Sequence, residues 1–315
     1  MKKALITGVS GFVGSHLSEY LLSQGIEIIG ITHPKFKSDN LKTFIHKIDI
    51  RTCNIMDKRN LKKTIENEQF DYVFHLAAFS SPTQSVKDPQ ETIENNVICQ
   101  LNLLEILSKM KTSAKILIIG SSEEYGDVEN KYIPVNEEAP LNPATPYAVS
   151  KITQDFLGLQ YFLHQNLKIV RVRPFNHIGP RHSTAFVIPA FASQIAQIEK
   201  VGKGQLKVGN LDAWRDFTDV RDICRAYLLA LDKGKLGDVY NIGSGNVYKI
   251  ADILEKLISF SSAKIKVVQE ESLMRENDTK KVVCDFSKFK NDTGWQPKIS
   301  IDTTLFDTIE YERKK

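Results

Sequence analysis

Tyr147 and Lys151 are the residues of this sequence best placed to do acid–base chemistry. They begin and end the segment Tyr-Ala-Val-Ser-Lys, and a helix places residues four apart on one face. A free phenol titrates near pH ~10, which makes it a poor acid or base at neutrality. A neighbouring ammonium favours the phenolate and lowers the pKa of the phenol. We therefore expect Tyr147 to exchange a proton with a hydroxyl or carbonyl group.

A serine follows an apolar segment upstream of that pair. Residues 116–119 predict a buried strand, and Ser121 comes two residues after it. The carboxyl ends of strands are where an α/β sheet presents ligand-binding groups, so the Ser121 hydroxyl can hydrogen-bond a reacting oxygen. Taken singly, the serine and the tyrosine–lysine pair are common at strand ends and on helices. Their order after a glycine-rich segment at the start of the chain makes a coincidence improbable.

The glycine-rich segment comes directly after the first apolar strand, Ala4-Leu5-Ile6. Gly8, Gly11 and Gly14 are spaced by three, and residues 14–24 then have helical periodicity. This spacing permits a tight turn and lets the backbone approach a pyrophosphate at a helix N-terminus. A glycine turn that only packs a helix on a sheet is the alternative. The position after a strand and before a helix favours a dinucleotide site.

The end of the second predicted strand, residues 26–31, bears on the choice of dinucleotide. A carboxylate at this place would hold a ribose 2′-hydroxyl and repel a 2′-phosphate. The sequence has Thr32-His33-Pro34-Lys35 there instead. We therefore expect NADP(H) to be favoured, with NAD(H) possible. Solvated loop residues are the alternative interpretation of His33 and Lys35.

The elements that must position these residues alternate between strands and helices. Apolar segments predict strands at 72–74, 115–119 and 168–172, and helical patterns cover 90–110 and 146–165. Continuous apolar strands between helices are typical of a parallel sheet that is covered on both faces. We therefore predict an α/β fold: a doubly wound parallel (Rossmann) sheet with a smaller C-terminal substrate-binding α/β domain.

The predicted domain boundary is discontinuous in sequence. Residues 1–173, with about 216–245, are assigned to the NADP-binding domain. About 174–215, with 246–315, are assigned to the substrate-binding domain. The stretch 173–215 is rich in Gly, Pro and Asn, and we expect an irregular insertion that binds a ligand. A helix at 222–231 and a strand at 239–242 then return the chain to the sheet.

Composition excludes several classes of function. The chain has 315 residues and a net charge of +4 from 42 basic and 38 acidic residues, which indicates no nucleic-acid footprint. The four cysteines and seven histidines are scattered, so we expect neither disulfides nor a metal site. The first residues lack the apolar core of a signal peptide, and no apolar run approaches membrane-spanning length. The expected location is cytoplasmic, with no membrane partner.

Together these motifs resemble the extended short-chain dehydrogenase/reductases. GxxGxxG, the strand-end Ser121 and YxxxK match that family, and further matches cover nearly the whole chain. These are Phe74-His75-Leu76-Ala77-Ala78, Asn96-Val97, Arg173-Pro174-Phe175-Asn176 and Arg215-Asp216-Phe217. The resemblance implies a catalytic triad of Ser121, Tyr147 and Lys151.

The resemblance also implies a cofactor site formed mainly by the first half of the chain. Leu76 to Ala78 would lie along the cofactor, and Asn54-Ile55 near adenine, where the family usually has Asp and a hydrophobic residue. The implied cofactor-binding residues are Gly8, Gly11, Phe12, Val13, Gly14, His33, Asn54, Ile55, Leu76, Ala77, Ala78, Asn96, Tyr147 and Lys151.

Two regions narrow the resemblance to enzymes of GDP-linked sugars. Residues 209–216 resemble the GDP-mannose-related branch, and residues 122–126 with 175–180 are most similar to GDP-4-keto-6-deoxymannose reductases. The resemblance assigns three residues to the substrate diphosphate, and a guanidinium suits that role because it can grip phosphate oxygens at two points. These three are Asn176, Arg215 and Arg275. The other implied substrate-binding residues are Ser81, Ser122, Glu123, Val187 and Asn210.

Alternatives remain for some of these residues. An ion pair with Asp216 or Glu276 is the alternative role of Arg215 and Arg275. His177 is expected to pack or to hydrogen-bond.

The predicted function is NADPH-dependent reduction of the C4 ketone of a GDP-4-keto-6-deoxyhexose, with Tyr147 supplying the proton. A GDP-mannose 4,6-dehydratase is the nearest alternative, because Glu123 stands where the elimination needs a base. A nucleotide-sugar epimerase uses the same scaffold. A dinucleotide-sensing regulatory protein is the non-enzymatic alternative, but it would be free to lose Tyr147 or Lys151. The family further suggests a homodimer through helices near residues 96–110 and 147–165.

Overall fold

A central parallel sheet organises the molecule. The computed structural model describes residues 1–35, 38–274 and 281–315. Within them, seven strands pair in the order β10-β6-β5-β4-β1-β2-β3, all parallel. These strands are β1 (Lys3–Thr7), β2 (Glu27–Thr32), β3 (Asp49–Thr52), β4 (Tyr72–His75), β5 (Lys115–Ile119), β6 (Lys168–Pro174) and β10 (Val239–Ile242). The order reverses between β1 and β4, which is where a doubly wound sheet opens a ligand crevice.

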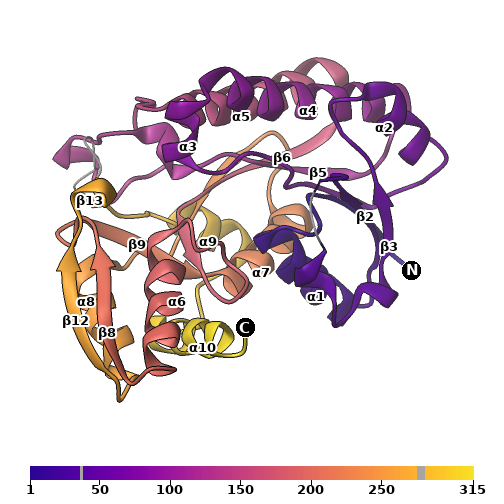
Figure 1. Cartoon of the computed structure of the whole chain (residues 1–315). Coiled ribbons are helices and arrows are strands. Elements are labelled where there is room, and N and C mark those ends of the chain that lie inside the picture. Colours follow the sequence, from indigo (N-terminus) through magenta and orange to yellow (C-terminus); the bar gives the residue numbers. More distant parts are fainter. Residues whose placement is uncertain (36–37, 275–280) are drawn as a thin grey trace.

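Helices cover both faces of this sheet (Figure 1). One face carries α1 (Phe12–Ser23), α7 (Val220–Lys233) and α9 (Ser287–Thr293), and the other carries α2 (Lys58–Ile65), α4 (Pro89–Lys109) and α5 (Pro146–Gln165). Successive strand residues point to opposite faces. Ile6 and Leu117 therefore join one buried cluster with α1 and α7, and Leu5 and Ile116 join another with α4 and α5. The predicted α/β fold is confirmed.

The remaining elements form a second, smaller group. A four-stranded sheet contains β7 (Asn176–Ile178), β9 (Trp214–Asp219), β11 (Val247–Lys249) and β13 (Lys281–Val282). A parallel pair, β8 (Lys203–Val208) and β12 (Lys264–Gln269), packs with α6 (Val187–Glu199), α8 (Ile250–Ser259) and α10 (Ile301–Arg313). These helices share one buried apolar cluster that runs from Ile178 to Ile309. We refer to the elements around this cluster as the second lobe.

The sequence analysis missed several elements and misjudged one stretch. Residues 173–215, expected to be irregular, contain the three-turn helix α6, whose buried face includes Ile188, Phe191 and Ile195. Their spacing of three and four is helical, but flanking glycines and prolines obscured it. Strand β3, helix α2 and the short helix α3 (Pro82–Lys87) were also not predicted. The predicted division of the chain into domains stays a prediction.

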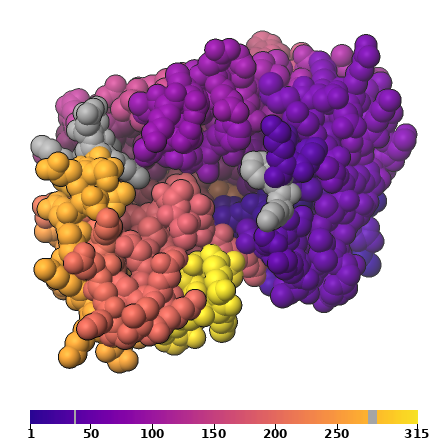
Figure 2. Space-filling view, in the orientation of Figure 1, coloured from indigo at the N-terminus to yellow at the C-terminus, as the bar shows by residue number. Residues whose placement is uncertain are grey.

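Short 3₁₀ turns complete the chain. They are η1 (Asp39–Leu41), η2 (Ile45–Lys47), η3 (Ser122–Tyr125), η4 (Asn130–Tyr132) and η5 (Glu271–Leu273). Among the described helices, none combines the length and apolar character needed to cross a membrane. The surface is hollowed between the sheet-bearing part of the chain and the salmon-coloured segment of the second lobe (Figure 2).

Candidate active site

The glycine loop connects β1 to α1 in a conformation that only glycine adopts readily. Gly8 has a φ of +72°, and a Cβ on it would lie 2.9 Å from the backbone nitrogen of Ala77. A Cβ on Gly14 would lie 2.3 Å from the Gly8 carbonyl oxygen, so Gly14 lets α1 pack against the loop. No side chain of a described residue caps the helix at Gly11. The N–H groups of the first turn, which includes Phe12 and Val13, are therefore available to an anion.

A buried histidine ties this loop to the end of β4. The Thr7 hydroxyl lies 2.9 Å from Nδ1 of His75 and accepts a bond from the Ala77 N–H at 3.2 Å. Burial, with the charge of Lys151, lowers the pKa of His75 to about 3, so the imidazole is neutral. This contact brings Leu76 and Ala77, which follow β4, beside Gly8, and Ala78 comes next in the chain. Thr7 and His75 were not among the predicted site residues, although both end strands that lead into the site.

Asn96 is placed differently from the expectation of a direct cofactor contact. Its side chain is fully buried and bonds to both backbone groups of Phe79 and to the Ser150 hydroxyl. These bonds connect the loop after β4 to α5. These contacts fix the Phe79 segment against α5, and a contact of Asn96 with the cofactor stays a prediction.

The region expected to receive the adenosine part lies at the ends of β2 and β3. Thr32, at the end of β2, shares a hydrogen bond of 2.8 Å with Ser10 of the glycine loop. His33 follows, and its Nδ1 accepts a bond from the Lys35 N–H at 3.2 Å. Asn54 closes a turn by accepting a bond from the Met56 N–H, while Ile55 is 5% exposed and belongs to the core. The Ile55 side chain can therefore contribute only a packed wall to this region.

Ser121 begins the turn η3 at the end of β5. Its hydroxyl accepts a bond from the Glu123 N–H at 3.2 Å, and the Glu124 carboxylate accepts one from the Ser121 N–H at 2.8 Å. This reciprocal arrangement is a capping box, which fixes the turn from both sides. The predicted residues Ser121, Ser122 and Glu123 are therefore presented together on one rigid turn.

Tyr147 and Lys151 lie in the first turns of α5, against that serine. The helix begins with Thr145 as its cap, and the Tyr147 N–H donates to the Ser85 hydroxyl at 3.1 Å. Both side chains are buried, with exposures of 9% and 4%. The Tyr147 and Ser121 side chains share a hydrogen bond, and Lys151 lies one helical turn after Tyr147 on α5.

The protonation of this pair differs from the expectation. Burial raises the pKa of Tyr147 well above its usual value, and Glu123 and Glu124 raise it further. The expected lowering by an adjacent ammonium is not observed, because Lys151 Nζ donates to Gln154 Oε1 at 2.8 Å. Burial lowers the pKa of Lys151 to about 8. Tyr147 therefore holds its proton, as an acid requires.

The predicted substrate residues lie on the second lobe and on the loop after β4. Asn176 on β7 and Arg215 on β9 stand on paired strands, with Asn176 opposite Phe217. Val187 begins α6, Asn210 precedes β9, and Ser81 caps α3. Arg275 lies outside the described residues. The predicted substrate residues therefore lie on several separate elements, whereas Ser121 and Tyr147 lie in contact with each other.

The Asp216 carboxylate faces away from Arg215, so it does not form the ion pair that was the alternative role of that arginine. It is fully buried and accepts bonds from the N–H groups of Ser244, Gly245 and Cys284 at 2.9, 2.9 and 3.1 Å. Adjacent residues of a strand point to opposite faces, so Arg215 projects from the other side of β9. His177 packs as expected, with its ring stacked on Phe12 and Nδ1 bonded to the Phe175 carbonyl.

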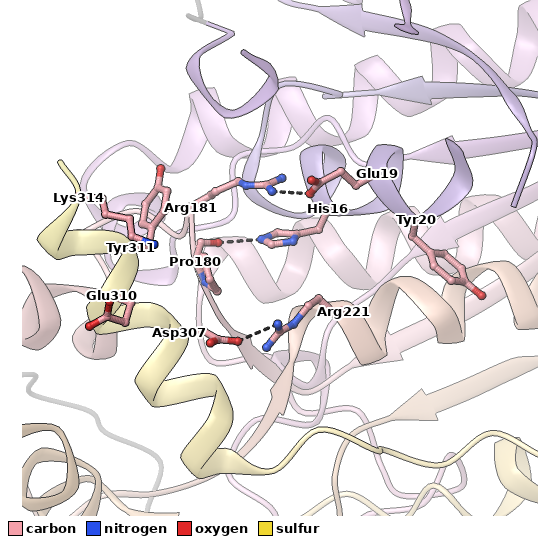
Figure 3. Close-up of a pocket in the computed structure, with 10 residues that line it drawn as sticks. All are labelled: His16, Glu19, Tyr20, Pro180, Arg181, Arg221, Asp307, Glu310, Tyr311 and Lys314. Carbon is pink, nitrogen blue, oxygen red and sulfur yellow. Dashed lines mark hydrogen bonds and ion pairs between the residues drawn. The ribbon is translucent and has the colours of Figure 1, made fainter. Parts of the chain in front are cut away.

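A separate cavity of about 610 Å³ lies between α1, α7 and α10 (Figure 3). Its charged side chains pair with one another, Arg221 with Asp307 at 2.8 Å and Arg181 with Glu19. His16 lines it and is bonded to the Pro180 carbonyl at 2.8 Å. None of the predicted catalytic, cofactor or substrate residues lines this cavity, so size alone does not locate the active site.

Comparison with known proteins assigns the chain to a family. The model of the GDP-mannose 4,6-dehydratase family matches residues 5–308. The chain belongs to this family of extended short-chain dehydrogenase/reductases. It is 33% identical to GDP-6-deoxy-D-mannose reductase of Pseudomonas aeruginosa over 96% of this chain and 95% of that protein. The predicted membership among nucleotide-sugar oxidoreductases is confirmed.

Two solved structures are similar over the full chain. RMD from Pseudomonas aeruginosa, complexed with NADPH, has a TM-score of 0.87 and 32% identity, covering 100% of this chain and 99% of that one. UDP-glucose 4-epimerase from Thermotoga maritima, with UDP-glucose, has a TM-score of 0.90 and 28% identity, covering 99% of both chains. The family's fold is therefore shared by enzymes of different nucleotide sugars.

Proposed function

We propose that this protein is an NADPH-dependent reductase of the C4 ketone of a GDP-4-keto-6-deoxyhexose. The observation that carries the proposal is the buried, protonated Tyr147 bonded to Ser121 beside an open glycine loop. Similarity to GDP-6-deoxy-D-mannose reductase over almost the whole chain supports the substrate.

The glycine loop fits a dinucleotide pyrophosphate. Because Gly8 has no Cβ, the backbone of the glycine loop can lie directly against the backbone of Ala77. The uncapped first turn of α1 offers N–H groups that can bind the pyrophosphate. Residues 32–35 carry no carboxylate, so a ribose 2′-phosphate meets no repulsion from them, and Ser10, Thr32 and His33 offer polar groups. NADP(H) is therefore the favoured cofactor, as in the similar complex of RMD with NADPH, and NAD(H) is possible. When bound, NADPH supplies the reducing equivalent for the ketone carbon.

The residues of the chain supply the proton and hold the reacting oxygen. Tyr147 donates its phenolic proton to the oxygen that was the ketone, while the Ser121 hydroxyl hydrogen-bonds the same oxygen. In this structure Lys151 Nζ donates to Gln154, so we propose that it turns toward Tyr147 as the phenolate forms and stabilises that charge, because an ammonium favours the charged form of a phenol. The rigid turn η3 and helix α5 fix these groups before the substrate binds, which removes part of the entropic cost of the reaction.

The substrate diphosphate is proposed to bind at β7 and β9 of the second lobe. Arg215 would grip it at two points and Asn176 would bond to it from the paired strand, with Arg275 as the further predicted contact. Replacing Arg215 by alanine should then raise KM about 10- to 100-fold, as expected for loss of a charge-assisted hydrogen bond. The affinity for NADPH should be unchanged. GDP should inhibit better than UDP or dTDP, and equal inhibition by all three would contradict the GDP assignment.

A GDP-mannose 4,6-dehydratase remains the second candidate because of one residue. Glu123 lies on the same turn as Ser121, half-buried, where it can serve as a base. Incubation with GDP-mannose, or with its 4-keto-6-deoxy derivative, with and without NADPH, separates the two functions by the mass of the product. The reductase proposal predicts a product only from the keto sugar, and only with NADPH.

The chain is further proposed to be a cytoplasmic homodimer. Val149, Phe156 and Leu163 recur every seven residues along α5, with exposures of 42%, 50% and 59%. On the adjacent helix α4, Ile93 and Ile98 are 38% and 36% exposed (Figure 1). Such a face is suited to a second copy of the same two helices. Phe156→Glu should yield monomers in sedimentation, while Phe306→Glu, equally exposed on α10, should not. Monomers of the unchanged protein at micromolar concentration would contradict this proposal.

A further inference from the structure

Glu124 is a buried carboxyl group directly beside the catalytic serine. Its side chain is fully buried, and Oε1 accepts the bond from the Ser121 N–H. Gly120 makes room for it, because a Cβ there would lie 2.3 Å from that same oxygen. The sequence analysis assigned no role to Glu124, since the adjacent Glu123 matched the family pattern.

Charged groups from two neighbouring elements face this carboxyl. From β6, Arg173 Nε lies 2.9 Å from Glu124 Oε2. From α5, Asp155 and Lys151 approach it, and Asp155 accepts bonds from Arg173 at 2.9 and 2.7 Å. Arg171 pairs with the other oxygen of Asp155 at 2.5 Å. Asp155 is thus shared between Arg171 and Arg173, and Glu124 is the second carboxylate that faces this buried pair of guanidinium groups.

The electrostatic influence of Glu124 reaches the predicted acid and its lysine. Burial, and then the charge of Asp155, raise the pKa of Glu124, while Arg173 opposes that rise. The Glu124 charge in turn raises the pKa of both Lys151 and Tyr147. Because the charges of Glu124 and Lys151 act on each other, the carboxyl proton of one and the ammonium proton of the other are released in two separate steps. The negative charge left on Glu124 by the first step opposes the second.

We propose that Glu124 is a positioning residue of this active site, which fixes the Ser121 turn through its capping bond and places a buried carboxylate beside Lys151. The proposal rests on the reductase function, in which Tyr147 acts as the proton donor. Glu124 acts through Ser121, Lys151 and Tyr147 and not by contact with the substrate. The bond from the Ser121 N–H to Glu124 holds the turn η3 in place. The charge of Glu124 extends the pH range over which Tyr147 can act as the acid.

The first test is the pH dependence of kcat/KM in Glu124→Gln. Glutamine can still accept the Ser121 N–H bond, so the turn is retained while the charge is lost. Without that charge the pKa of Lys151 and Tyr147 falls, and the alkaline limb of the profile should move to lower pH by about one unit. Glu124→Asp, which keeps the charge, should retain the position of the limb at a lower kcat. The matched control is Glu129→Gln, which should leave the profile unchanged. Glu129 is an exposed carboxylate of the following loop and pairs with Lys131. An unshifted limb in Glu124→Gln would overturn the proposal.

A second measurement needs neither a variant nor the substrate. In protein labelled with ¹³C at the glutamate carboxyl carbon, one buried glutamate should titrate between about pH 6 and pH 9, far above an ordinary glutamate. A Glu124 carboxyl that stays protonated above pH ~9 would overturn the proposal even if Glu124→Gln does not fold, because it would carry no charge to act on Lys151 and Tyr147. Conversely, wild-type protein that shows the titration but does not reduce the keto sugar would refute the reductase function and leave the buried Glu124–Lys151 pair in place.

Discussion

At the scale of single residues, burial controls the chemistry more than the tyrosine–lysine spacing does. Tyr147 and Lys151 lie on the predicted helix, and Ser121 lies beside Tyr147, while their catalytic roles stay predictions. Sequence could not show that Lys151 bonds to Gln154, or that burial raises the pKa of Tyr147. Both depend on how α5 packs against β5 and η3. A protonated phenol suits a reductase, which needs an acid at neutral pH.

Tyr147→Phe tests the acid directly. The ring still fills its buried site, but the proton donor and the bond to Ser121 are lost, so kcat should fall by roughly 10²–10⁴. NADPH affinity should remain within a few-fold of the wild-type value. Tyr161→Phe is the control, because this tyrosine lies buried on the same helix away from the triad. Near-normal turnover of Tyr147→Phe in a stopped-flow assay of NADPH absorbance would show that another group supplies the proton.

At the scale of elements, the most predictable features were those with strong local signals. Apolar runs located β1, β2, β4, β5 and β6, and the glycine spacing located the turn into α1. The signal was weak for β3, with the sequence Asp-Ile-Arg-Thr, because an edge strand needs no apolar run. Helix α6 was hidden by the flanking Gly and Pro residues. The positions of Asn96 and Glu124 follow from contacts between distant segments, which no local pattern encodes.

The glycine loop offers a matched pair of substitutions. Gly8 and Gly25 both have positive φ, at +72° and +70°, but a Cβ meets the Ala77 backbone at Gly8 and nothing within 4 Å at Gly25. Gly25→Ala should therefore cost only backbone strain, about 1–2 kcal/mol of stability, and leave NADPH binding intact. Gly8→Ala should displace the loop from β4 and weaken NADPH binding at least tenfold. Fluorescence titration with NADPH measures both, and equal affinities would contradict the assigned cofactor site.

At the scale of the whole molecule, the predicted catalytic residues and the predicted diphosphate-binding residues lie on different parts of the fold. The sheet carries the glycine loop, Ser121 and Tyr147, while Asn176 and Arg215 stand on the second lobe. The alternation of apolar strands and helical patterns correctly predicted the α/β fold. It could not indicate how the second lobe assembles, because β7, β9, β11 and β13 come from four separate stretches of sequence.

Buried neutral histidines should make stability depend on pH. The pKa of His75 is about 3 in the folded protein and near ~6.5 when unfolded, so its contribution is present above pH ~6.5 and is lost as pH falls. We expect wild-type protein to lose about 2 kcal/mol relative to His75→Gln between pH 7 and pH 5. Taking the difference between the two proteins cancels other groups, including Glu124, whose raised pKa acts in the opposite direction. Urea unfolding at fixed ionic strength measures this difference, and a constant difference would mean that folding does not lower the pKa of His75.

The central claim, that the site reduces a ketone with net consumption of cofactor, is tested most directly by the stoichiometry of NADPH oxidation. With a GDP-4-keto-6-deoxyhexose, we expect NADPH oxidised and alcohol formed in equal amounts, and only a modest loss of rate in Glu123→Gln. GDP-mannose should remain unchanged under the same conditions. Conversion of GDP-mannose to a 4-keto product without net cofactor consumption, abolished by Glu123→Gln, would contradict the account and identify the protein as a dehydratase.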